Sequence, residues 1–146
     1  MITLTLVREM IRVALETSHQ MGLKPMSVAV LDAGGHLLAF EREDGASPGR
    51  FEIAFGKAYG AVMLGMPGSA QMARAEEQPY FIAAAAVAFG GKMIPVPGGV
   101  LVKDATGAVI GAVGVTGDSS DNDATAALAG IKAAGFSLPL IHIRPC

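Results

Sequence analysis

The sequence predicts an α+β fold in which helices pack on an antiparallel or mixed sheet. Two stretches have the pattern of β-hairpins, and helical patterns precede, separate and follow them. The short strand-to-helix spacings that a doubly wound parallel sheet requires are missing. With 146 residues and 51% hydrophobic content, the chain has the size and apolar content of one domain, which we expect to span residues 1–146.

The first helix is expected from Thr5 to about Met21. Thr5 is a candidate N-cap, and Gly22 suits the left-handed conformation that ends many helices. The apolar residues follow the spacing of one helix face, at Leu6, Val7, Met10, Ile11, Ala14 and Met21.

The two hairpins are expected on either side of the middle of the chain. In the first, "MSVAVLD" and "LLAFERE" flank the glycine turn "AGGH". In the second, strands Gly99–Lys103 and Ala108–Val115 flank the turn "DATG".

Further helices are expected between and after the hairpins. One begins at Phe51 and stops before "GMPG", and shorter helical stretches cover Gln71–Met72 and Pro79–Val87. The last lies in "DNDATAALAGIKAAGF", where Asp121, Asn122 and Asp123 supply an N-cap and an acidic first turn.

Composition excludes several classes of partner. The 11 basic and 13 acidic residues give a net charge of -2, so we expect no binding of nucleic acid or of an anionic membrane. The longest apolar runs, such as 81–89, are about half of the roughly 20 residues that a spanning helix needs. The chain is rich in Gly, Ala and Met and only 16% charged, which leaves little polar surface for a small monomer. We therefore expect a homo-oligomer.

The cysteine content and the first residues predict a cytoplasmic location. Cys146 is the single cysteine, which excludes an internal disulfide and a cysteine-based metal cluster and fits a reducing compartment. Arg8, Glu9 and Arg12 interrupt the apolar pattern near the N-terminus, where a secretory signal needs an unbroken apolar core.

Glycine strings and histidines are the first candidates for a site. "DAGGH", "GGKMIPVPGG" and "GAVGVTG" suit either ordinary turns or the rim of a polar pocket, and none has the spacing of a P-loop or a dinucleotide fingerprint. His19, His36 and His142 lack the spacing of a helix-borne zinc pair. His19 and His36 are each either solvent-facing or an axial ligand to a haem iron, which needs one imidazole from one or two subunits.

A charged cluster follows the second strand. Arg42 and Asp44 leave that strand on one face, and Lys57 falls on the following helix, so all three are expected to border one cleft. A purely structural ion-pair network is the alternative interpretation.

Four blocks in order resemble the GlcG/HbpS family, which includes haem-binding proteins and the C-terminal domain of PduO. They are "VAVLDAGGHLLAFEREDGA", "AFGKAYGAV", "PVPGGVLVKDATGAVIGAVGVTG" and "DNDATAALAG", within residues 5–136. The positions that match the family motifs are Asp32, Gly34, Gly35, Arg42, Asp44, Gly45, Ala46, Lys57, Ala58, Gly111, Gly114, Gly117 and Asp123.

The resemblance implies a profilin-like sandwich and a symmetric assembly with ligand pockets near subunit contacts. It also implies haem binding for some members and haem degradation for a few. Among the residues of this chain, His19 is the best candidate for the iron ligand. Glycines that let a flat ligand or a neighbouring subunit approach the backbone are Gly34, Gly35, Gly98 and Gly99.

Two functions follow as hypotheses. The first is a small oligomeric protein that binds haem or a related tetrapyrrole, with or without haem-degrading activity, and uses charged rim groups to pair its propionates. The second is a cofactor-free enzyme of the isomerase, lyase or hydrolase type that acts on a small organic acid in a catabolic pathway. In that case Arg42 or Lys57 holds the carboxylate, and Asp44 or Asp123 moves a proton.

Overall fold

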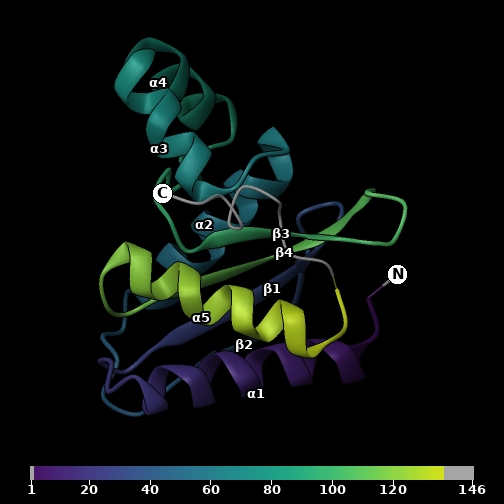
Figure 1. Cartoon of the computed structure of the whole chain (residues 1–146). Coiled ribbons are helices and arrows are strands. Elements are labelled where there is room, and N and C mark those ends of the chain that lie inside the picture. Colours follow the sequence, from purple (N-terminus) through teal and green to yellow (C-terminus); the bar gives the residue numbers. More distant parts are fainter. Residues whose placement is uncertain (1, 137–146) are drawn as a thin grey trace, which may run out of the picture.

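A computed structural model of the chain describes residues 2–136, and its elements form a four-stranded sheet with helices on both faces (Figure 1). His142 and Cys146 lie outside the described residues. The strands are β1 (Ser27–Asp32), β2 (Leu37–Arg42), β3 (Gly99–Lys103) and β4 (Val109–Thr116). The helices are α1 (Leu4–Gln20), α2 (Arg50–Leu64), α3 (Gly68–Glu77), α4 (Pro79–Ala88) and α5 (Ser120–Ala133). The α+β prediction and both hairpins are confirmed.

The sheet has the order β2-β1-β4-β3, and every neighbouring pair is antiparallel. The central pair joins the two hairpins, because β1 lies beside β4 with Ser27 opposite Thr116. β2 is an edge strand whose residues are half-buried or exposed, whereas β1 is almost fully buried. The interior of the sheet is therefore made by strands from opposite ends of the described chain.

Alternate residues of β1, β3 and β4 pack in two separate layers, one on each face of the sheet. Side chains on one face of the sheet pack under α1 and α5, which lie side by side in Figure 1. Those on the other face pack under α2. The first layer holds Val28, Val30, Val100, Val102, Val113 and Val115, and the second holds Leu31, Leu101 and Ala112. This division follows from the two-residue period of a strand.

Glycines set the distance between α2 and the sheet. A Cβ atom on Gly114 would lie 2.0 Å from the carbonyl oxygen of Ala54, and one on Gly99 would lie 2.2 Å from that of Lys57. Both distances are far below any contact between real atoms, so the backbone of α2 lies directly on the backbone of β3 and β4. Only glycine permits such an approach.

Helix ends are where sequence and structure differ. Thr3, not Thr5, caps α1 and accepts a hydrogen bond from the Leu6 backbone N–H at 3.3 Å. Ser119 caps α5, so Asp121 and Asp123 belong to its first turn. Gly22 follows α1 with a φ of 69°, as expected. Several neighbouring residues have capping side chains, and which of them caps depends on where tertiary packing starts the helix.

Gly114→Ala tests the close packing of α2. Because the added methyl group meets backbone atoms, we expect the substitution to lower the free energy of unfolding by about 1–3 kcal/mol or more. The control is Gly49→Ala, since a Cβ atom there meets nothing within 4 Å and the φ of Gly49 is an ordinary -78°. Urea denaturation of both variants measures the difference, and equal midpoints would contradict the packing described above.

Candidate functional site

A hollow of about 570 Å³ lies where the end of α1 meets the end of β2. It is lined by His19, Gly22, Leu23, Pro25, Arg42, Glu43 and Asp44. We call this set the α1-end hollow. The charged residues at the end of β2 and just after it therefore line one cavity together with a histidine and a short apolar segment. A volume of this size falls within the range of small-molecule sites, although this one is open.

His19 is presented to the hollow by the last turn of α1. Its side chain is 70% exposed, and its Nε2 atom forms a hydrogen bond with the Glu43 carboxylate. The second oxygen of Glu43 accepts from the Met26 backbone N–H at 2.7 Å, and the Glu43 N–H donates to the Met26 carbonyl at 2.9 Å. Glu43 is thus fixed to the start of β1 and in turn holds the His19 ring.

Glu43 is a site residue that the sequence analysis did not single out. It stands between Arg42 and Asp44 in a run of charged residues, so nothing local separates it from them. Its side chain is only 15% exposed, which shows that its role depends on the fold. Arg42 and Asp44 also line the hollow, and within residues 2–136 their side chains make no ion pair.

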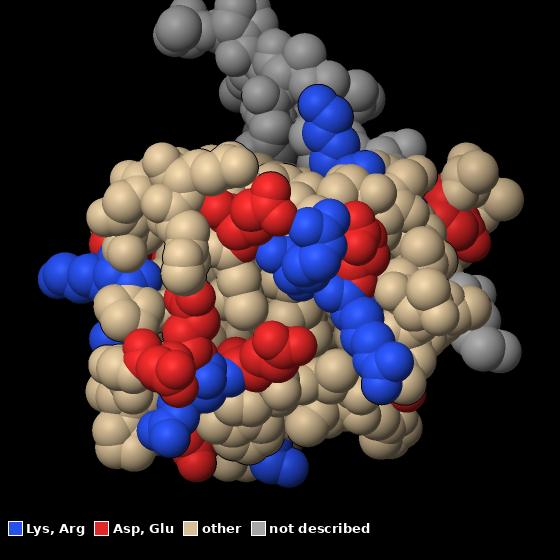
Figure 2. All heavy atoms as spheres, turned by 90° about the horizontal axis from the view of Figure 1, so that it is seen from below, with Lys and Arg blue, Asp and Glu red and all other residues tan. Residues whose placement is uncertain are grey.

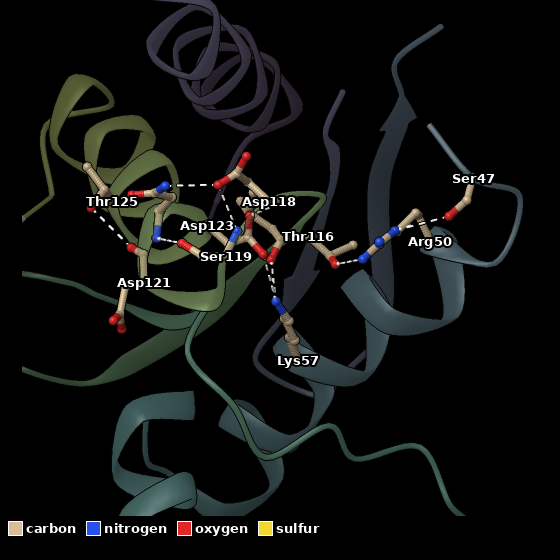
Figure 3. A network of polar contacts seen from close by, with 11 residues as sticks. Ser47, Arg50, Lys57, Thr116, Asp118, Ser119, Asp121, Asp123 and Thr125 are labelled. Atoms are coloured by element: carbon tan, nitrogen blue, oxygen red, sulfur yellow. Dashed lines mark hydrogen bonds and ion pairs between the residues drawn. The ribbon is translucent and has the colours of Figure 1, made fainter. Parts of the chain in front are cut away.

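Lys57 and Asp123 form a second polar feature, buried between α2, β4 and α5 (Figure 3). The Lys57 Nζ atom lies 3.1 Å from Asp123 Oδ2 and donates to the Val115 carbonyl at 3.0 Å. The two side chains are 3% and 1% exposed. Burial lowers the pKa of Lys57 below its ordinary value, and the neighbouring Asp123 carboxylate offsets part of that effect.

The structure therefore separates the residues that the sequence placed at one cleft. Arg42 and Asp44 line the α1-end hollow, whereas Lys57 does not and is buried with Asp123. The physical reason is that Lys57 lies on the face of α2 that packs on the sheet. Arg50, two turns before Lys57 on the same face of α2 and not predicted as a site residue, donates to Thr116 Oγ1 at 2.8 Å and to Ser47 Oγ at 3.1 Å (Figure 3).

The two predicted glycine pairs have different surroundings. Gly34 and Gly35 belong to the β1–β2 turn, where Asp32 Oδ1 accepts from the Gly34 and His36 N–H groups, both at 2.9 Å. These hydrogen bonds lower the pKa of Asp32, the bond from His36 most of all. Gly98 and Gly99 line a cavity of about 170 Å³ between β3, α3 and α5, and both pack on Lys57. The turn interpretation thus suits the first pair, and the pocket-rim interpretation suits the second.

The described residues hold no ready-made metal cluster and no membrane-spanning helix. No group of three His, Cys, Asp or Glu side chains within residues 2–136 is arranged to bind a metal ion. His36 is exposed and lies 3.2 Å from Asp32. No helix in the same range is long and apolar enough to cross a membrane. On the α1 side, acidic and basic groups are interspersed (Figure 2), and Arg12 pairs with Glu9 and Glu16.

The buried pair predicts an asymmetry between single and double substitutions. Lys57→Met leaves the Asp123 carboxylate buried without its cation, so we expect a loss of about 3–5 kcal/mol in the free energy of unfolding. The double variant Lys57→Met with Asp123→Leu removes both charges and should lose less than the sum of its two single variants. Arg12→Met is the control, because Arg12 pairs with carboxylates on the surface, and this variant should lose much less stability than Lys57→Met. Additive losses in urea denaturation would contradict the coupling.

Asp118 predicts a loss of stability in acid. Hydrogen bonds from the Asn122 side chain, and then from the Ser119 and Lys24 N–H groups, lower the pKa of Asp118 to about 2. The unfolded chain has an Asp pKa of about 3.9, so this contribution to stability is complete above that value and disappears as the pH falls towards 2. In Asp118→Asn the decline of the urea midpoint between about pH 4 and pH 2 should be shallower than in the wild type. An equally steep decline would assign the acid sensitivity to other groups.

Comparison with known proteins places this chain within a family. The family model described as "Haem degrading protein HbpS-like" matches residues 2–132. A search of curated protein sequences finds no match. The HbpS crystal structure is 32% identical with a TM-score of 0.79, and the alignment covers 92% of this chain and 90% of HbpS.

Two further solved structures share the fold. Protein ORFY of Klebsiella pneumoniae, assigned to DUF336, is 25% identical with a TM-score of 0.82 and coverage of 91% of this chain and 90% of that one. The haem complex of PduOC is 24% identical with a TM-score of 0.83 and coverage of 93% and 96%. The match of nearly the whole chain to the family model, together with these likenesses in structure, shows that this protein belongs to the HbpS-like family.

Proposed function

We propose that this protein binds haem or a related tetrapyrrole in the α1-end hollow, with His19 as the iron ligand. The observation that carries the proposal is an exposed imidazole held by a half-buried carboxylate beside apolar and cationic wall residues. The description of the HbpS-like family and the haem complex of PduOC support the same ligand class.

The residues of the hollow fit a haem group in three respects. His19 has one ring nitrogen bonded to Glu43, and in the tautomer with a proton on Nε2 the other nitrogen, Nδ1, is free to ligate a metal. A carboxylate partner of this kind is the usual orienting group for a metal-binding histidine. Leu23 and Pro25 supply apolar contact, and Arg42 supplies a cation for a propionate. Bound haem would supply redox chemistry at its iron, while this chain binds and orients it.

The openness of the hollow supports self-association as part of the proposal. A planar ligand in an open site has one face towards this chain and the other uncovered. A second copy, related by symmetry, would cover that face and offer a second His19. We therefore propose a homo-oligomer, as the composition predicts, and a single-domain, cytoplasmic protein.

Haem titration tests this function. Haemin added to the wild-type protein should give a saturable Soret shift, and His19→Ala should weaken haem affinity by about tenfold or more. His36→Ala is the control, because that histidine is also exposed and paired with a carboxylate but lies in the β1–β2 turn. A non-saturating spectrum, or equal affinity in His19→Ala and wild type, would overturn the proposal.

The same samples test haem degradation, the activity named for the family. With oxygen and an added reductant such as ascorbate, degradation predicts a Soret band that decays with time and needs His19, whereas pure binding predicts a stable band. The second candidate function is the cofactor-free enzyme acting on a small organic acid. It is favoured by the buried Lys57 with its lowered pKa beside Asp123, and it predicts turnover without haem.

A further inference from the structure

Helix α4 is apolar on all sides although most of it faces solvent. Its sequence, "PYFIAAAAVA", contains no charged residue. Among the helices and strands of residues 2–136 its backbone lies close only to α3, which itself meets α2 and β3, and α4 lies on the side of α3 away from the sheet (Figure 1). A helix that is hydrophobic all round is normally buried, so the exposed side of α4 lacks a partner within residues 2–136.

The uncovered residues form one continuous face. They recur at the spacing of a single helix surface and are Tyr80, Ala83, Ala84, Val87 and Ala88, which we call the α4 face. Tyr80 is 70% exposed and Val87 is 80% exposed. The opposite side is already occupied, because Ile82 and Ala85 pack into a small cluster. Two alanines between a tyrosine and a valine, and a third after the valine, leave a shallow surface on which another helix can approach closely.

Charges of opposite sign stand at the two ends of the α4 face. Glu76 and Glu77 precede α4 and Lys92 follows it, and all three are exposed. The Lys92 ammonium lies over the Tyr59 ring at 5.7 Å and makes no ion pair within residues 2–136. An antiparallel neighbour with the same sequence would bring the acidic end of one helix to the basic end of the other.

We propose that the α4 face packs on the α4 face of a second copy, with the two helices antiparallel about a two-fold axis. In such an interface the same patch serves both subunits, and the Glu76, Glu77 and Lys92 charges of one copy complement those of the other twice. A lipid surface is a poorer match, because membrane-bound amphipathic helices carry Lys or Arg along their polar side and α4 has none. The inference rests on the self-association proposed above and adds a second contact between copies, because the α4 face shares no residue with the α1-end hollow.

Size-exclusion chromatography with light scattering tests the surface. Val87→Glu places a charge at the centre of the α4 face and should lower the mass by at least a factor of two relative to the wild type. Because Val87 is 80% exposed, the urea midpoint of the Val87→Glu variant should differ from the wild-type midpoint no more than that of an ordinary surface variant does. Leu4→Glu is the matched control, since Leu4 is an exposed apolar residue of α1, 49% exposed, and its variant should keep the wild-type mass.

A charge exchange tests the antiparallel arrangement. Lys92→Glu alone, and Glu76→Lys with Glu77→Lys, should each raise the dissociation constant about two- to fivefold or more, the range of exposed ion pairs. Combining all three substitutions restores the complementarity in a symmetric pair and should return the constant towards the wild-type value. Sedimentation velocity over a dilution series measures these constants. Losses that add in the combined variant would overturn the antiparallel arrangement.

The outcomes separate this inference from the haem proposal. An oligomer whose mass is unchanged in Val87→Glu overturns the α4 interface and leaves self-association standing. A wild-type monomer overturns both the α4 interface and the proposed self-association. The same holds for a monomer that captures a different protein or floats with phosphatidylcholine vesicles. A mass that falls in Val87→Glu while the wild type shows no saturable Soret shift supports the α4 interface and overturns haem binding.

Discussion

The backbone contact between α2 and the sheet is the constraint on which the rest of this structure depends. It exists because Gly99 and Gly114 have no side chains where β3 and β4 meet the helix. At that separation Lys57 cannot reach solvent, and its ammonium group has to find partners inside the protein. Asp123 and the Val115 carbonyl supply them, which ties α5 and β4 to α2 through one cation.

That constraint also explains why the polar residues form two separate groups, the buried Lys57–Asp123 pair and the α1-end hollow. Buried Lys57 has a lowered pKa of the kind that is common at functional sites, but ion pairs that hold elements together perturb pKa values in the same way. The α1-end hollow has exposed groups, a held imidazole and room for a ligand. The α1-end hollow is the site of the proposed flat, partly apolar ligand, whereas the Lys57–Asp123 pair stabilises the frame around it.

Sequence patterns predicted the helices and strands well, but they predicted poorly which side chains of different elements contact one another. The hairpins, α1 and α2 follow from periodicity and glycine turns, and α4 follows from an apolar run that begins at Pro79. Their bounds differ from the expected ones by a few residues at most. The full length of α3 was missed, because Met72 is the single large apolar residue in "GSAQMARAEE". Arg42, Asp44 and His19 were each predicted, but their place at one hollow, the partnership of Glu43 with His19, and the burial of Lys57 depend on contacts between distant segments. No local rule encodes such contacts, since they arise only when the helices pack.

The order of the strands has a consequence for the folding of the chain during its synthesis on the ribosome. β1 is made early, yet one of its two neighbours is β4, which is made after all the helices except α5. Until β4 emerges, β1 and β2 form an isolated hairpin with apolar side chains exposed, and such a hairpin is marginally stable in water. Completion of the core is therefore a late event in synthesis, and the long separation between the paired strands favours slow folding. During that interval the nascent chain presents an unpaired, hydrophobic strand edge, which is the kind of surface that chaperones shield.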